Sequence, residues 1–218
     1  MEEALNKIKE RIIDILLPKR CVACGKEGQY ICNKCELFLS EAPNSINNLV
    51  SIWEYEGVIE KLIWKIKYDG MYHAVDELTE KAFEVMIKDT SRFQSFLEFL
   101  LNPDTCITYV PMYKKKEKQI GFNQAELIAK EIGKITRKKG VKLLDKVKDN
   151  KSQAGLSPEE RLKNVKDAFI FNSSFLPQKV LIVDDFYTSG ATIMECCRVL
   201  RENGIKNTWG FVLAKSDH

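Results

Sequence analysis

Two adjacent carboxylates, Asp184 and Asp185, stand in a stretch whose residue types suit a sugar-phosphate ligand. They follow the short apolar run 180–183, which is rich in β-branched residues and predicts a buried strand. A small turn rich in hydroxyl groups and glycine follows at 188–192, and apolar positions then continue at helical spacing up to Gly204. A strand, an acidic pair, a small turn and a helix in this order are typical of a ligand site at the carboxyl end of a parallel strand.

The turn suits a phosphate group, and the acidic pair suits a ribose. Backbone N–H groups of the turn and the positive end of the following helix favour an anion, and the hydroxyls of Thr188, Ser189 and Thr192 add donors. The two carboxylates accept hydrogen bonds from ribose hydroxyls, either directly or through a hard cation such as Mg²⁺. The alternative is a plain strand–turn–helix connection in which the aspartates cap the helix. The stretch is neither a Walker A loop nor a G-x-G-x-x-G loop.

This stretch resembles the phosphoribosyl-pyrophosphate (PRPP) signature of type I phosphoribosyltransferases. The resemblance implies that Asp184 and Asp185 hold the ribose 2′ and 3′ hydroxyls and form the catalytic pair, while the turn wraps the 5′-phosphate. In such enzymes the loop after the first core strand takes the pyrophosphate. The PRPP contacts that follow are Asp184, Asp185, Phe186, Thr188, Ser189, Gly190, Ala191 and Thr192, together with Tyr113 and Lys114.

Four of the seven cysteines form two C-x-x-C pairs separated by seven residues. They are Cys21, Cys24, Cys32 and Cys35. Each pair can bring two thiolates to one tetrahedral ion, and four soft ligands in a closed shell predict a structural Zn²⁺ ion. The alternatives are four unrelated reduced cysteines or a redox-active pair. The remaining three, Cys106, Cys196 and Cys197, have apolar neighbours and are expected to be buried thiols.

Length and composition predict one elaborated domain, or one domain with a small appendage. The chain has 218 residues and a net charge of +3, which is too small to indicate nucleic-acid binding from overall charge. No apolar run is long enough to span a membrane, and the first residues lack the pattern of a signal peptide. We therefore expect a cytoplasmic protein with no membrane insertion.

The repeating β-loop-α order predicts an α/β fold with a mostly parallel sheet and helices on both faces, preceded by a small zinc ribbon. We expect an amphipathic helix over 1–17, with domains at 1–48 (helix, ribbon and linker) and 49–218 (phosphoribosyltransferase-like). Strands are expected near 49–55, 106–110, 141–147, 166–171, 180–184 and 208–214, with helical regions near 57–68, 75–101, 122–137 and 190–203.

Two charged segments are expected to close the site. The flexible basic loop at 111–118 carries lysines that would meet a pyrophosphate, although Lys115 and Lys116 could equally face solvent. Residues 148–164 occupy the place of the mobile hood that excludes water in type I enzymes, and a short helix is expected within it. There, Arg161 could contact pyrophosphate, nucleic acid or only solvent.

Several motifs together resemble those of the ComF family over residues 17–214. One position departs from the family pattern, because Ile120 stands where an arginine is usual, and Lys118 would have to supply any phosphate contact made there. The motifs are Leu17-Pro18 before the cysteines, Tyr55-Glu-Gly57, Lys65-Ile-Lys67-Tyr68, Val110-Pro111, Gly121-Phe122-Asn123-Gln124-Ala125, Gln153…Leu156…Arg161…Asn164…Ala168-Phe169 and the acidic signature.

The resemblance implies a protein of natural competence that takes up and handles transforming single-stranded DNA, with PRPP as ligand and other competence proteins such as a helicase as partners. The composition of the segment 111–151 agrees with DNA binding, since it contains thirteen basic residues and five acidic ones. Base stacking would use Phe122, Tyr113 or Tyr68. The alternative, which is favoured for Trp53, Trp64 and Tyr68, is that these aromatic residues lie in the core and at its rim.

A transferase of this kind would displace Mg²⁺-pyrophosphate from the anomeric carbon of PRPP, mostly by positioning and electrostatic stabilisation. No general base is visible, because the histidines are His73 and His218 alone. Two further functions stay open. One is a metabolic phosphoribosyltransferase with a base or amine as acceptor, and the other is a non-catalytic PRPP sensor.

Overall fold

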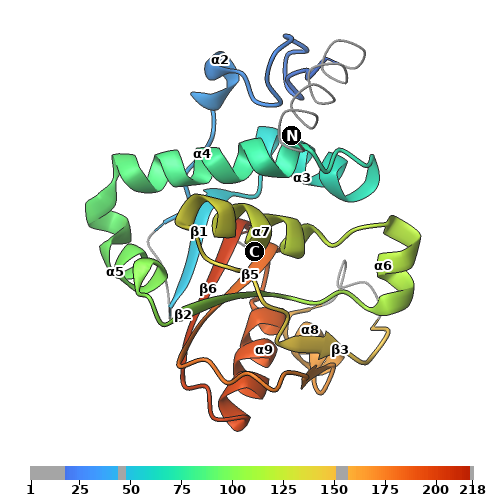
Figure 1. The fold of residues 1–218 in the computed structure, drawn as a ribbon. Coiled ribbons are helices and arrows are strands. Elements are labelled where there is room, and N and C mark those ends of the chain that lie inside the picture. The colour runs from blue at the N-terminus through green and yellow to red at the C-terminus, as the bar shows by residue number, and fades with distance from the viewer. Residues whose placement is uncertain (1–17, 44–47, 151–156, 217–218) are drawn as a thin grey trace, which may run out of the picture.

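The fold is built on a four-stranded parallel sheet with the strand order β1-β6-β5-β2 (Figure 1). The computed structural model describes residues 18–43, 48–150 and 157–216, so the expected helix over 1–17 and the motif residues Gln153 and Leu156 lie outside the described residues. The strands are β1 (Leu49–Glu54), β2 (Thr105–Tyr109), β5 (Lys179–Tyr187) and β6 (Asn207–Lys215).

Helices cover both faces of this sheet, as expected for the α/β class. Alternate residues of β5 separate the two cores, since Leu181 and Val183 pack into one and Val180 and Ile182 into the other. Of the described helices, none combines the length and the hydrophobicity that a membrane span requires. The first core contains α3 (Gly57–Tyr68), α4 (Ala74–Lys88), α5 (Thr90–Leu101) and α7 (Gln124–Thr136), and the second contains α9 (Ala191–Glu202) (Figure 1).

The basic segment after β2 is a helix and not the flexible loop that was expected. It forms α6 (Lys114–Ile120), and Gly121, at φ 90°, ends it in the left-handed conformation that glycine adopts without strain. Lysine, glutamine and glutamate favour helices, which explains a helix without a buried face. Asn123 then caps α7 by accepting the N–H of Ala125.

The strands expected near 141–147 and 166–171 are not strands of the main sheet, although the N–H of Val141 donates to the carbonyl of Ile107 on β2 at 2.8 Å. They form a separate antiparallel pair, β3 (Leu144–Lys146) and β4 (Phe169–Phe171). Between them lies α8 (Pro158–Val165), the expected short helix, which begins with a capping box made by Ser157 and Glu160. The helical region expected at 75–101 is likewise two helices, because Asp89 ends α4 and caps α5.

The cysteine-rich ribbon packs against α4 through polar and apolar contacts. It contains the single-turn helix α2 (Asn33–Glu36). The N–H of Ile31 donates to Glu77 at 2.9 Å, and the nearly buried ammonium of Lys81 lies 2.6 Å from Glu36. Since Ile31 and Val22 belong to the same apolar cluster as α3 and α4, the ribbon is seated on the main core. The domain boundary at residue 48 stays a prediction.

Candidate functional site

The two predicted site aspartates lie within β5, and not at its end. The strand runs three residues beyond the expected end because it continues to pair with β6, where Phe186 stands opposite Ala214. Each carboxylate accepts the N–H of the next residue: Asp184 Oδ1 lies 2.9 Å from the amide nitrogen of Asp185, and Asp185 Oδ1 lies 2.7 Å from that of Phe186. These bonds orient both carboxylates at the carboxyl end of the sheet.

Asp185 forms an ion pair that the sequence did not predict. The ammonium nitrogen of Lys67, from the last turn of α3, lies 2.8 Å from Asp185 Oδ2 and 3.8 Å from the ring centroid of Phe186. Phe186 in turn stacks on Tyr55, with ring centroids 4.6 Å apart. Lys67 and Tyr55 stand in motifs that carry the family resemblance, which is the signal that could have found them.

Asp184 interacts electrostatically with a second lysine, Lys146. The pKa of Asp184 is raised to about 7, because burial and then repulsion from Asp185 outweigh the opposing positive charges of Lys67 and Lys146. Lys146 lies half-buried on β3, where burial and then the charge of Lys116 lower its pKa and Asp184 raises it. Charged side chains on α6, β3 and β5 (Lys116, Lys146 and Asp184) therefore influence one another. The sequence pointed to Lys146 only as a member of a lysine-rich segment.

The turn between β5 and α9 contains groups that could bind an anion. Gly190 caps α9 at φ 72° and has no side chain to satisfy the first helical amides. Ser189 Oγ is buried and has no hydrogen-bond partner among the described residues. A Cβ atom at Gly190 would lie 2.5 Å from Cε2 of Tyr187, so a larger residue would close the turn. The predicted residues from Thr188 to Thr192 thus span the turn and the first residues of α9, where backbone N–H groups favour an anion.

The segment with Tyr113 and Lys114 begins beside the acidic pair. The N–H of Val110 donates to the carbonyl of Val183 at 2.9 Å, one residue before Asp184. Asn123 holds this segment, because its Nδ2 donates to the carbonyl of Val110 at 3.0 Å while its Oδ1 caps α7. The expected pyrophosphate loop therefore leaves the sheet next to the expected ribose site.

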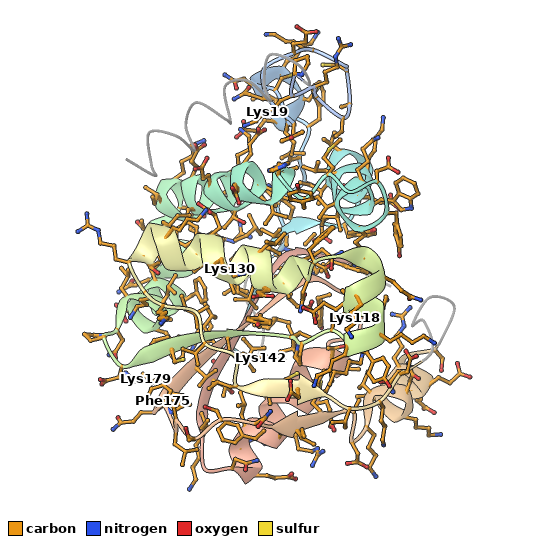
Figure 2. The ribbon with its side chains drawn as sticks, turned by 45° about the vertical axis from the view of Figure 1, so that its right-hand side comes forward. Lys19, Lys118, Lys130, Lys142, Phe175 and Lys179 are labelled. Carbon is orange, nitrogen blue, oxygen red and sulfur yellow. The ribbon has the colours of Figure 1, made fainter. Side chains whose placement is uncertain are left out.

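The lysines of α6 form an unpaired basic surface. Within the described part of the chain, none of the four forms an ion pair, whereas Lys130 and Lys142 pair with acids at 2.9 and 2.6 Å. Figure 2 shows Lys118, Lys130 and Lys142 on one side of the molecule, on separate segments. The four lysines are Lys114, Lys115, Lys116 and Lys118. A shallow cleft of about 360 Å³ on α6 is lined by Lys114, Glu117, Lys118 and Gly121.

The hood segment is anchored to α9. The N–H of Asp167, just after α8, donates to the Glu195 carboxylate on α9 at 2.6 Å. The same carboxylate accepts a hydrogen bond from Arg198 at 2.7 Å. On α8 itself, Arg161 has a buried Nε with no hydrogen-bond partner among the described residues. A ligand contact by Arg161 stays a prediction.

The four ribbon cysteines could hold a metal ion such as zinc. Their sulfur atoms all lie within 4.8 Å of one another, a spacing that one tetrahedral ion can bridge. Burial and the neighbouring sulfurs together raise the pKa of Cys35 to about 12, so a cation would favour a thiolate there. Of the other cysteines, Cys106 and Cys196 are buried as expected, and Cys197 is partly exposed.

No family model matches the chain. It is 28% identical over 200 residues to a protein named competence protein F of Haemophilus influenzae, covering 89% of this chain and 84% of that protein. It is 25% identical over 198 residues to the competence protein ComFC of Streptococcus pneumoniae, covering 90% and 81%. It is also 23% identical over 185 residues to the DNA utilization protein YhgH of Escherichia coli, covering 84% and 78%.

Proposed function

Similarity to these competence and DNA utilization proteins assigns the chain to the ComF family, and on this premise we propose that it binds PRPP and handles single-stranded DNA during DNA uptake. One observation carries the PRPP part. Two oriented carboxylates on β5 stand before a turn in which Gly190 has no side chain to cap α9 and the buried Oγ of Ser189 has no hydrogen-bond partner in the described part of the chain. This combination fits a ribose with a phosphate at its 5′ position.

In this proposal each element meets one part of PRPP. The amides of the turn and Ser189 bind the 5′-phosphate, and Asp184 and Asp185 bind the ribose hydroxyls. The lysines of α6, the helix that follows β2, and Lys146 on β3 face the diphosphate. If ribose is transferred, the acceptor bonds to the anomeric carbon while pyrophosphate leaves, and these cations stabilise the departing charge.

A Mg²⁺ ion fits the donor set of the site. The two carboxylates are hard oxygen ligands, and the raised pKa of Asp184 shows that more positive charge would be accommodated beside it. Bound with PRPP, such an ion would neutralise diphosphate charge. Likewise, we propose that the ribbon metal is a structural Zn²⁺ ion, because four thiols leave no open coordination position.

The DNA part of the proposal is supported by the charge of α6 and the names of the relatives. Four exposed lysines without partners would bind phosphates independently of sequence, with an affinity that falls as salt rises. Binding of a labelled single-stranded oligonucleotide should weaken between low and physiological salt. Replacing the four α6 lysines by glutamine should reduce that salt dependence, and an unchanged affinity across salt would contradict an electrostatic contact.

Thermal unfolding with and without PRPP and Mg²⁺ tests the ligand directly. The native chain should be stabilised by PRPP, and the double variant Asp184→Asn/Asp185→Asn should not be. Ribose 5-phosphate alone should give a smaller stabilisation through the turn. If the double variant is stabilised as much as the native chain, PRPP binds elsewhere and the assignment is wrong.

Pyrophosphate release then separates transfer from sensing. A metabolic transferase would release pyrophosphate from PRPP when offered a purine, a pyrimidine or an amine. A transferase acting on DNA would do so only with single-stranded DNA, and a sensor would bind PRPP without turnover. The variant Asp185→Asn is the control for release by a contaminant.

A further inference from the structure

Resting on the proposed handling of single-stranded DNA, we infer that exposed aromatic side chains on α3 and the turn after it form a stacking platform for the bases of the strand. The platform consists of Trp64, Tyr68 and Tyr72. It lies beside the Asp185–Lys67 pair, so a strand held there would pass the mouth of the proposed PRPP site.

The exposure of these rings is the first observation. Trp64 is 49% exposed and Tyr68 is 69% exposed, although Trp53, on β1, is 2% exposed. Trp64 and Tyr68 stand four residues apart on α3, with ring centroids 5.5 Å apart and planes tilted by 49°. Adjacent large aromatics in water mark an interaction site more often than a packing defect. The sequence had favoured a rim role for both residues.

The aromatic surface continues toward α6. Tyr72 is 43% exposed, and its ring centroid lies 4.1 Å from that of His73 and 5.5 Å from that of Phe122. Phe122 follows Gly121, the residue that ends the lysine helix α6. A strand lying on the aromatic residues would therefore reach the four unpaired lysines without leaving the surface.

The platform also adjoins the proposed active site. Lys67 precedes Tyr68 on α3 and reaches Asp185 at 2.8 Å. Behind it, Tyr55 stacks on Phe186, and Tyr68 lies near enough to Tyr55 to contribute to its raised pKa after burial, Glu60 and Asp185. Through Lys67, the helix that carries Tyr68 thus contacts the acidic pair.

The charges around these rings favour nucleic acid over a protein partner. Lys61 and Lys65 share the face of α3 that carries Trp64 and Tyr68. Lys65 pairs with Asp69 at 3.1 Å, whereas Lys61 forms no ion pair within the described residues and could meet a phosphate beside the rings. Four of the five aliphatic side chains of α3, which a protein interface would use, are buried instead, and the fifth, Val58, is partly buried: Ile59, Leu62, Ile63 and Ile66 are the buried ones.

The test compares two labelled oligomers of equal length on the full chain, one of thymidines and one of abasic sites, by fluorescence anisotropy. The double variant Trp64→Ala/Tyr68→Ala should weaken thymidine binding by at least about fivefold, because each stacked base contributes on the order of 1 kcal/mol or more. Binding of the abasic oligomer and the slope of affinity against salt should not change. The variant Trp64→Phe/Tyr68→Phe keeps the rings and should bind nearly as well as the native chain.

A matched control uses an exposed ring far from α3. Phe175 is 54% exposed and lies at the other end of the molecule, so Phe175→Ala should leave thymidine binding unchanged (Figure 2). Quenching of native tryptophan fluorescence by the thymidine oligomer, lost in Trp64→Phe, gives a second readout that needs no alanine variant.

Equal binding of both oligomers, or thymidine binding unchanged by Trp64→Ala/Tyr68→Ala, would overturn the platform. Stabilisation by PRPP is measured on the same variant. If it persists while thymidine binding is unaffected, only the platform is wrong. If the native chain binds neither PRPP nor any oligomer, the proposed function itself fails.

Discussion

Replacing Asp184 by asparagine should stabilise the protein at pH 8 and leave its stability at pH 4 almost unchanged. Burial and repulsion from Asp185 raise the pKa of Asp184 to about 7, from an ordinary value of 3.8. Between these pH values the unfolded chain has released the proton that the folded chain retains. The free energy of unfolding therefore falls as pH rises from about 4 to about 7, and stays lower above pH 7. Asparagine cannot be charged, so it removes this fall.

The size of the effect follows from the two pKa values. Their difference corresponds to at most about 4 kcal/mol at pH 8. We expect about half of this, since the side chain is only partly buried and solvent screens its charge. The asparagine Oδ1 can still accept the N–H of Asp185, so no hydrogen bond is lost with the charge.

Urea unfolding in Mg²⁺-free buffer at several pH values between 4 and 8 measures this difference. The gain of Asp184→Asn over the native chain should grow with pH and level off above about 7. Asp185→Asn is the contrasting variant, because it leaves the ammonium of Lys67 without its partner and should lose about 1–3 kcal/mol at pH 8. A loss of stability in Asp184→Asn that is equal at all pH values would refute the electrostatic reasoning.

Three further variants probe other parts of the site. Lys67→Met leaves a carboxylate unpaired and should cost about 1–3 kcal/mol in urea unfolding, whereas Lys67→Arg should restore most of it. Gly190→Ala should lose most of the PRPP-dependent thermal shift, because the added Cβ would lie 2.5 Å from the ring of Tyr187. Gly204→Ala is the control, since Gly204 also has a positive φ but has open space around it, and this variant should lose only about 1–2 kcal/mol of stability. Cys32→Ser should lower both the zinc content and the melting temperature, since the ribbon shares the main core, and an unchanged melting temperature would contradict that coupling.

The sheet and the position of the turn could be predicted because their signals are local. The apolar run 180–183 is fully buried between two cores, and such a run reads as a strand in any context. The Gly121-to-Ala125 motif also proved to be local structure, a helix end followed by a helix cap. The spacing of the cysteines is also a local signal, and the four sulfur atoms that it marked lie together in the structure.

Other features depend on contacts that local patterns do not contain. The helix α6 has no buried residue, so no hydrophobic periodicity marked it. The pairing of β3 with β4 could not be distinguished from a place in the main sheet, because strands of three residues fit either. Lys67 reaches Asp185 across 118 positions of sequence, and only the packing of α3 on the sheet brings them together.

The place of β6 in the sheet has a consequence for how the chain is assembled. One edge of β1 pairs with β6, where Leu49 stands opposite Gly210. β1 is therefore synthesised long before β6, the strand that provides the hydrogen-bond partners of this edge. Its other edge finds partners at once, since the N–H of Ala42 donates to the carbonyl of Ile52 at 2.9 Å and the N–H of Glu54 donates to the carbonyl of Ser40 at 2.8 Å. During synthesis one edge of an apolar strand therefore stays open, which predicts slow closure of the sheet and dependence on chaperones until residues 207–215 arrive.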